Sequence, residues 1–284
     1  MTFKDVGILG SGIMGSGIAE VCASAGAFVT VRTRSEAAGD ALLIGVEKSL
    51  AKQVEKQKLS SHDADELRGR ITTTTSMSDL HDCDLVIETV VEDIAIKRSL
   101  FNELDRSVNK DAIFATNTST LSVIDLAMET SRPDLVCGLH FFNPAPAMSL
   151  VEVVRPLCAS AGTIQSVTEF ALACGKEPVE VKDQAGFVVN ALLFPYLNNA
   201  IRLLEQGVAD KEGIDTAMKG GCGFPMGPFA LLDLVGLDTS LSILDALHAE
   251  FAEPNFAPVP LLRRMVSAGQ LGRKSGIGFY DYRR

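Results

Sequence analysis

The sequence predicts an α/β protein in which a doubly wound, mostly parallel β-sheet is followed by an all-helical C-terminal domain. Three observations carry this prediction. Short apolar runs alternate with longer helical stretches over the first ~180 residues, which is typical of a parallel sheet with right-handed crossovers. A glycine-rich turn follows the first apolar run directly. Beyond residue 183 the strand pattern stops, and apolar residues recur at the three- and four-residue spacing of helices.

The predicted strands are short segments rich in apolar and β-branched residues. They cover Val6–Leu9, Phe28–Val31, Asp84–Val91, Ile113–Thr116, Leu135–Leu139, Leu150–Val154 and Pro178–Val181. The helices predicted between them cover Met14–Ala25, Glu36–Gln57, Ile94–Ser107, Val123–Met128 and Thr163–Cys174. The longest run, DLVIETVV, is apolar over most of its length, which is typical of a strand buried on both faces.

In the C-terminal part of the chain, the sequence pattern predicts only helices, which are separated by glycine and proline residues. They cover Phe187–Gln206, Asp210–Lys219, Phe229–Asp233, Asp238–Ala252 and Leu261–Ala268. We place the domain boundary near Lys182–Gly186, which divides the chain into residues 1–183 and 184–284. Pro195 lies inside the first of these helices, where proline usually introduces a kink.

Composition and charge exclude several classes of protein. The 284 residues are 46% apolar and 22% charged, as in globular proteins and unlike disordered ones. The net charge of −10 argues against a nucleic-acid partner, because an acidic chain repels phosphate backbones. No apolar run reaches the ~20 residues that span a bilayer, and the N-terminus lacks a signal-peptide pattern. The dispersed cysteines and histidines show no metal-ligand spacing, so we expect a cytoplasmic protein with reduced thiols, no metal and no membrane partner.

The motif G-x-G-x-x-G at Gly10–Gly15 indicates a dinucleotide-binding turn. It follows the first predicted strand and opens the first predicted helix, which is the context that the motif requires. Gly10 permits the tight turn, Gly12 lets the backbone approach a pyrophosphate, and Gly15 allows close packing of helix on strand. The helix N-terminus adds free N–H groups and a partial positive charge. A turn without a ligand is the alternative. We expect a Rossmann-like domain whose cofactor contacts include Gly10, Gly12, Ile13, Met14 and Gly15.

The end of the second predicted strand carries no carboxylate. Dinucleotide-binding domains usually place an acidic residue about 20 residues after the glycine motif, where it bonds the ribose hydroxyls. Here the residues are Arg32, Thr33 and Arg34, and arginine is suited to bidentate phosphate binding. We therefore favour NADP as the cofactor, bound through these three residues. The alternative is that both arginines are solvated and that NAD is used.

A histidine and a glutamate form the candidate catalytic pair. His140 follows a buried-type strand and enters a loop stiffened by Pro144 and Pro146, and doubly wound sheets bind ligands outside the carboxyl ends of their strands. Glu152 lies in the apolar run Leu150–Val154, where an unpaired carboxylate is costly. Pairing the two residues would fix the imidazole tautomer and raise its basicity. Spacing alone is equally compatible with a core histidine and an unrelated edge glutamate.

Seven segments, taken in order, resemble the L-3-hydroxyacyl-CoA dehydrogenase family, specifically its short-chain bacterial 3-hydroxybutyryl-CoA dehydrogenase branch. They read GILGSGIMGSGIAE, DLVIETVVED, ATNTSTLS, GLHFFNPAP, GFVVNALLFPYLNNAI, PMGPFALLDLVGLD and LGRKSGIGFY. The similarity covers essentially the whole chain. It implies that the protein interconverts (S)-3-hydroxyacyl-CoA and 3-ketoacyl-CoA by hydride transfer with NAD or NADP.

The resemblance implies a role for each residue at a matching position. His140 would be the general acid/base at the 3-oxygen of the substrate, with Glu152 as its partner. Ser119 would hydrogen-bond the reacting oxygen, and Asn190 would reach the site from the first helix of the second domain. Positions that approach the cofactor in the family are matched by Glu92, Lys97, Asn117 and Asn143.

The same resemblance predicts how the CoA group and a second subunit are bound. Family members hold the CoA phosphates with lysines that follow strand two, and Lys52 and Lys56 are the best matches. Their i, i+4 spacing places them on one helical face, for which a solvated surface is the alternative. Homodimerisation through the C-terminal helical domain is also implied. The chief departure is Thr33, where the family usually has an aspartate.

Other functions stay open at this point. A non-catalytic cofactor-binding protein is one, because a fold does not fix a function. A dehydrogenase of free 3-hydroxy acids is another. Within the leading hypothesis, the substrate is either a C4 or a longer acyl-CoA, and the reaction runs in degradation or in biosynthesis. The joint presence of His140, Glu152, Ser119 and Asn190 favours an enzyme.

Overall fold

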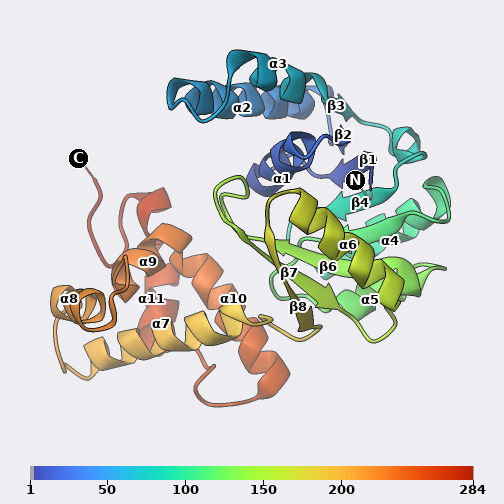
Figure 1. Cartoon of the computed structure of the whole chain (residues 1–284). Helices are drawn as coiled ribbons and strands as arrows, with labels where there is room; N and C mark the ends of the chain where they lie inside the picture. The colour runs from blue at the N-terminus through green and yellow to red at the C-terminus, as the bar shows by residue number, and fades with distance from the viewer. Residues whose placement is uncertain (1–2, 284) are drawn as a thin grey trace. The chain divides into compact units, whose positions relative to one another are not determined.

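An eight-stranded sheet forms the centre of the first part of the chain in the computed structural model, which describes residues 3–283. The strand order is β3-β2-β1-β4-β5-β6-β7-β8 (Figure 1). Strands β1 to β6 are parallel, whereas β7 runs antiparallel to β6 and β8 runs parallel to β7. The strands are β1 (Asp5–Leu9), β2 (Phe28–Arg32), β3 (Ile71–Thr74), β4 (Leu85–Glu88), β5 (Ile113–Thr116), β6 (Val136–Phe141), β7 (Leu150–Arg155) and β8 (Glu177–Lys182).

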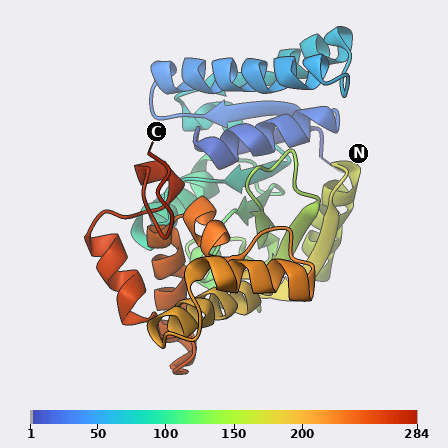
Figure 2. The same ribbon diagram turned by 90° about the vertical axis from the view of Figure 1, so that its left-hand side faces the viewer.

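Helices cover both faces of this sheet. One core combines alternate strand residues, such as Val6 and Ile8, with four helices: α1 (Ile13–Ser24), α2 (Glu36–Glu55), α3 (Ser61–Gly69) and α6 (Ala161–Ala173). Figure 2 shows α2 along its length at the edge of this layer. The other face carries α4 (Ile94–Ser107) and α5 (Val123–Ala127), and the ring of Phe101 meets that of Phe114 at 6.2 Å there. Burial on both faces explains why the strands read as apolar runs.

Two elements of this sheet layer lie outside the predicted pattern, α3 and β3. β3 reads Ile-Thr-Thr-Thr at the sheet edge, and Ile71 is its one buried residue. The sequence of β3 therefore contains no apolar run that would predict a strand, although threonine itself favours strands. Helix α3 buries two residues, Ala64 and Leu67, so its apolar face is too narrow for a clear helical period.

The second unit, from Gln184 onward, consists of packed helices. They are α7 (Val189–Glu205), α8 (Lys211–Cys222), α9 (Pro228–Val235), α10 (Leu237–Phe251) and α11 (Pro260–Ser267). Helix α7 packs against the other four, and its residues Phe194, Leu197 and Ile201 are buried in the core of the unit. It is one continuous element although Pro195 lies inside it. The predicted sheet domain followed by helices is confirmed. None of the helices within residues 3–283 is long and apolar enough to cross a membrane.

Candidate active site

The centre of the candidate site is a pair of residues on neighbouring antiparallel strands. In the register of β6 and β7, His140 is the direct partner of Glu152. Opposite residues of an antiparallel pair present their side chains on the same face, a few ångströms apart. Accordingly, Nδ1 of His140 lies 2.7 Å from a carboxylate oxygen of Glu152. Both side chains are buried, with exposed fractions of 5% and 1%, so the hydrogen bond stabilises a carboxylate that would otherwise be costly in the interior.

Ser119 extends this pair from the loop after β5. Its hydroxyl oxygen lies 3.0 Å from Nε2 of His140, the ring nitrogen that does not face Glu152. The ring of Phe142 lies against the imidazole, with centroids 4.5 Å apart. Because an ionised carboxylate only accepts hydrogen bonds, Nδ1 carries a proton and donates it to Glu152. Nε2 is then available to accept or return a proton at a ligand beside Ser119.

The loop that carries Ser119 is fixed by its neighbours. The carboxylate of Glu92 accepts hydrogen bonds from the backbone N–H of Ser119 at 2.9 Å and of Thr120 at 3.3 Å, and from the hydroxyl of Thr118. The side-chain oxygen of Asn117 accepts a hydrogen bond from the N–H of Phe141 at 2.8 Å, which ties the end of β5 to the end of β6. These contacts place Ser119 at the carboxyl edge of the parallel strands, where doubly wound sheets bind their ligands.

The predicted glycine turn connects β1 to α1. Gly10 has a φ of +112°, which glycine adopts without strain. A Cβ at Gly15 would lie 2.1 Å from the carbonyl oxygen of Gly10, so helix and turn meet too closely for any side chain. A Cβ at Gly12, by contrast, would meet no atom within 4 Å. Gly12 is the N-cap of α1 and offers no side chain to the first turn, so that turn fits an anion such as a pyrophosphate. Ile13 is 77% exposed and Met14 is partly buried in this first turn.

The end of β2 offers cations beside this turn. The backbone N–H of Gly10 donates to the carbonyl of Arg32 at 3.1 Å, so the two segments are adjacent. Nε of Arg32 is buried and has no hydrogen-bond partner in the structure. Arg34 is exposed, whereas Thr33 is buried and its hydroxyl donates to the carbonyl of Ser35 at 2.7 Å. The site therefore has one unsatisfied guanidinium donor and no carboxylate at this strand end.

A buried ion pair lies behind the Ser119 loop. The ammonium of Lys97, on α4, lies 2.8 Å from both carboxylate oxygens of Glu88 at the end of β4, and neither side chain is exposed. Lys97 also lies 3.4 Å from Glu92. A cofactor role for Lys97 stays a prediction, since its ammonium is enclosed by these carboxylates and has no exposed surface.

Two further ionisable groups hold loops next to the site. Lys176 donates to the carbonyls of Ala145 and Met148 at 2.7 and 2.8 Å and so fastens the loop between β6 and β7, which includes the exposed Asn143. Burial lowers the pKa of this ammonium. Asp183 accepts hydrogen bonds from the first two N–H groups of α5 at 3.0 and 2.7 Å, and burial raises the pKa of its carboxyl.

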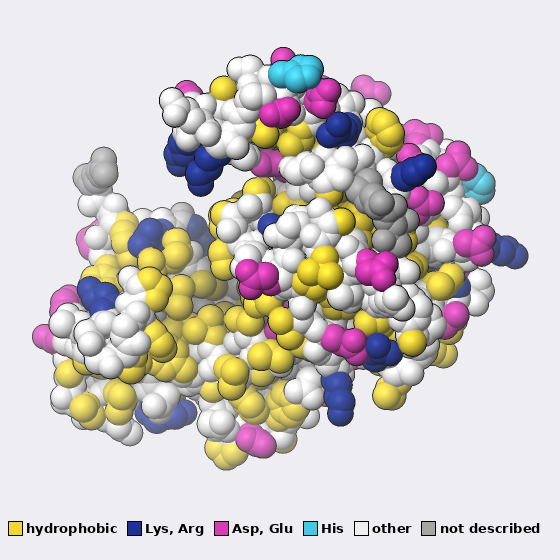
Figure 3. Space-filling view, in the orientation of Figure 1, with side chains coloured by type: hydrophobic (Ala, Val, Ile, Leu, Met, Phe, Trp, Pro, Cys, Tyr) yellow, Lys and Arg dark blue, Asp and Glu magenta, His cyan; other side chains and the backbone are white. Residues whose placement is uncertain are grey.

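Lysines follow one face of α2. Lys48, Lys52 and Lys56 are all exposed at four-residue spacing, and Lys48 extends the predicted pair. Figure 3 shows Lys and Arg side chains gathered on the part of the surface that α2 occupies. These residues form a cationic row, as binding of a polyphosphate requires.

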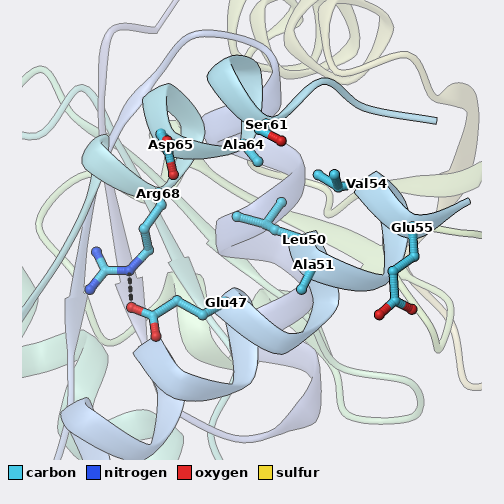
Figure 4. A pocket seen from close by; sticks show the side chains of 9 residues that line it. All are labelled: Glu47, Leu50, Ala51, Val54, Glu55, Ser61, Ala64, Asp65 and Arg68. Carbon is cyan, nitrogen blue, oxygen red and sulfur yellow. Dashed lines mark hydrogen bonds and ion pairs between the residues drawn. The ribbon is translucent and has the colours of Figure 1, made fainter. Parts of the chain in front are cut away.

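A hollow of about 370 Å³ lies between α2 and α3, and the lysine row lies outside its lining. Three acidic residues belong to its lining: Glu47, Glu55 and Asp65 (Figure 4). The one cation in the lining, Arg68, is paired with Glu47 at 2.9 Å. Because such a lining repels phosphate groups, we do not assign the hollow to either predicted ligand.

Asn190 is the second residue of α7, in the second unit, and its role beside His140 stays a prediction. Glu88, Lys176, Asp183 and Lys48 were not singled out from the sequence. Glu88 carries a signal that would have found it, because a carboxylate inside an apolar strand needs a buried partner, as Glu152 does. Within residues 3–283, no group of three or more His, Cys, Asp or Glu side chains is arranged to hold a metal ion.

Comparison with known proteins gives full-length matches. The family model "3-hydroxyacyl-CoA dehydrogenase, NAD binding domain" matches residues 5–184, and the model of the family's C-terminal domain matches residues 186–282. A 3-hydroxybutyryl-CoA dehydrogenase of Mycobacterium tuberculosis is 50% identical over 98% of each chain. The mitochondrial hydroxyacyl-coenzyme A dehydrogenase of Homo sapiens is 45% identical over 99% of this chain and 91% of its own. The crystal structure of a (S)-3-hydroxybutyryl-CoA dehydrogenase from Ralstonia eutropha is 43% identical and superposes with a TM-score of 0.97, covering 99% of this chain and 100% of its own.

Two glycines of the turn allow a matched test of the cofactor site. Gly12→Ala adds a methyl group where the protein has free space, so the melting temperature should stay unchanged. A methyl group forced against a bound pyrophosphate costs ~1–3 kcal/mol, so dinucleotide affinity should fall roughly 10- to 100-fold. Gly15→Ala should instead lower the stability, because its methyl group collides with the carbonyl of Gly10. Fluorescence titration and thermal unfolding separate the two effects, and unchanged affinity in Gly12→Ala would contradict the site.

Proposed function

The chain belongs to the 3-hydroxyacyl-CoA dehydrogenase family, and from this premise we propose that it oxidises (S)-3-hydroxyacyl-CoA to 3-ketoacyl-CoA and catalyses the reverse reduction. The observation that carries the proposal is the line of hydrogen bonds from Glu152 through His140 to Ser119, at 2.7 and 3.0 Å. It places a proton-exchanging nitrogen beside a hydroxyl that can bind the reacting oxygen. The similarity to 3-hydroxybutyryl-CoA dehydrogenases supports a C4 acyl-CoA substrate.

In the oxidation, the C3–H and O–H bonds of the substrate break and a C3=O bond forms. The bound nicotinamide dinucleotide supplies the acceptor for the hydride. His140 takes the hydroxyl proton on Nε2, and Glu152 stabilises the imidazolium that results. In the reduction, His140 returns this proton to the oxygen as negative charge develops on it. Ser119 donates a hydrogen bond to the same oxygen and orients C3.

We propose NADP as the preferred cofactor. The adenosine 2′-phosphate would meet the guanidinium groups of Arg32 and Arg34, and no carboxylate at the end of β2 repels it. The buried, unsatisfied Nε of Arg32 supports this proposal, because such a donor is stabilised by an anionic partner. The same absence of a carboxylate removes the usual acceptor for the ribose hydroxyls of NAD.

The proposed CoA site is the lysine row of α2, formed by Lys48, Lys52 and Lys56. In a chain with a net charge of −10, an anionic substrate needs such local cations. A homodimer formed through the second unit is supported by large apolar side chains that are exposed there: Leu192, Val208, Phe224 and Leu234.

The proposed chemistry predicts that His140→Gln loses most of its turnover. With acetoacetyl-CoA and reduced cofactor, kcat should fall ~10²–10⁴-fold, which is the usual share of acid/base catalysis. Glu152→Gln should also be slow and should change the pH–rate profile, because the proton on Nδ1 loses its anionic acceptor. His62→Gln, an exposed histidine on α3, is the control and should retain full activity. Near-normal turnover of His140→Gln, or a wild-type protein inactive on acetoacetyl-CoA, would refute the assignment.

The cofactor proposal predicts a higher kcat/KM with NADPH than with NADH. Arg34→Ala should raise the KM for NADPH about 10- to 100-fold, since a hydrogen bond to a charged group contributes ~1.5–3 kcal/mol. The KM for NADH should change little. Arg106→Ala removes an exposed arginine from the last turn of α4 and is the control. A clear advantage for NADH in the wild-type protein would overturn the proposal.

A further inference from the structure

The buried ion pair behind the Ser119 loop is enclosed by further hydrogen bonds. Glu88 accepts four hydrogen bonds: two from Lys97, one from the hydroxyl of Thr116 at 2.7 Å and one from the N–H of Val90 at 2.6 Å. Both oxygens of this carboxylate are therefore satisfied. The carboxylate links β4, β5 and α4, and it holds the Lys97 ammonium at one place in the interior.

The fixed ammonium of Lys97 also attracts the carboxylate of Glu92. One carboxylate oxygen of Glu92 faces the Lys97 ammonium at 3.4 Å. The other accepts from the N–H groups of Ser119 and Thr120 at 2.9 and 3.3 Å. Glu92 is 39% exposed, so burial does not hold it in place. Glu92 is held instead by its attraction to the enclosed ammonium and by its hydrogen bonds with the loop.

We infer that Glu88 and Lys97 are positioning residues: their buried ion pair holds Glu92, and through Glu92 it holds the turn that carries Ser119 against His140. The inference rests on the proposed dehydrogenase function. Glu88 then affects the reaction by positioning Lys97 and does not contact the substrate.

The electrostatics of the cluster explain why removal of Lys97 should displace the turn. Lys97 is the cation that separates two carboxylates, those of Glu88 and Glu92. Without it the two negative charges repel each other, and Glu92, the exposed one, is free to move into solvent. The N–H of Ser119 then loses its acceptor, and its hydroxyl loses a fixed distance to Nε2 of His140. A displacement of about 1 Å at a reacting group can cost 100-fold in rate.

A double-mutant cycle between Lys97 and Ser119 tests this inference. Lys97→Met should lower kcat about 10- to 100-fold at saturating cofactor. In the Ser119→Ala background the same substitution should change kcat less than about twofold, because the hydroxyl that it positions is already absent. A loss of stability alone would reduce activity equally in both backgrounds. Equal losses in the two backgrounds would overturn the inference.

The control is a second buried ion pair on the same helix. Arg132 pairs with Asp105 of α4 at 2.9 Å, and Arg132 is 6% exposed. It lies before the amino end of β6, whereas the site lies at the carboxyl ends of the strands. Arg132→Met should lower the melting temperature but leave kcat unchanged where the protein is folded.

Should Lys97→Met fail to fold, Glu92→Ala takes its place, and it should show the same non-additivity with Ser119→Ala.

Amide hydrogen exchange gives a readout that does not depend on turnover. The N–H groups of Ser119 and Thr120 should exchange faster in Lys97→Met than in the wild-type protein, and at the wild-type rate in Arg132→Met. Unchanged exchange in Lys97→Met would contradict the inference even in an active enzyme. If the variants show this exchange pattern but the wild-type protein does not turn over acetoacetyl-CoA, the result contradicts the proposed function and not the inference.

Discussion

The antiparallel pairing of β6 with β7 is the constraint on which the site depends. It places His140 directly opposite Glu152 in an otherwise parallel part of the sheet. A slip of one residue would turn one of the two side chains to the opposite face and would bury an unpaired carboxylate. The register is therefore fixed by the same hydrogen bond that orients the imidazole. The loops after β4 and β5 then bring Ser119 to the ring nitrogen that does not face Glu152.

Acidic residues stabilise this edge of the sheet, whereas the proposed ligand contacts are cations and a helix N-terminus. Glu152, Glu88 and Glu92 each accept hydrogen bonds from groups that form or support the site. The proposed anionic ligands would meet other elements: the N-terminus of α1, the arginines at the end of β2 and directly after it, and the lysine row of α2. This separation explains how a chain with a net charge of −10 holds two phosphate-bearing molecules.

Much of the fold followed from the sequence, because apolar runs and helical periods are strong signals where both faces of a strand are buried. β3 was not predicted, because it consists mainly of threonines at the edge of the sheet and has no apolar run. The predicted strand Asp84–Val91 is longer than β4, which covers Leu85–Glu88. The pairing of His140 with Glu152 was open on spacing alone and became definite with the strand register. Lys176 is defined by its hydrogen bonds to the distant carbonyls of Ala145 and Met148, which a linear pattern does not contain.

The proton positions on His140 test the central claim most directly. Nitrogen NMR of histidine-labelled protein reports which ring nitrogen is protonated. We expect a proton on Nδ1, donated to Glu152, and an unprotonated Nε2 that accepts from Ser119. This preference should be lost in Glu152→Gln. A proton on Nε2 in the wild-type protein would contradict the acid/base role derived from the site.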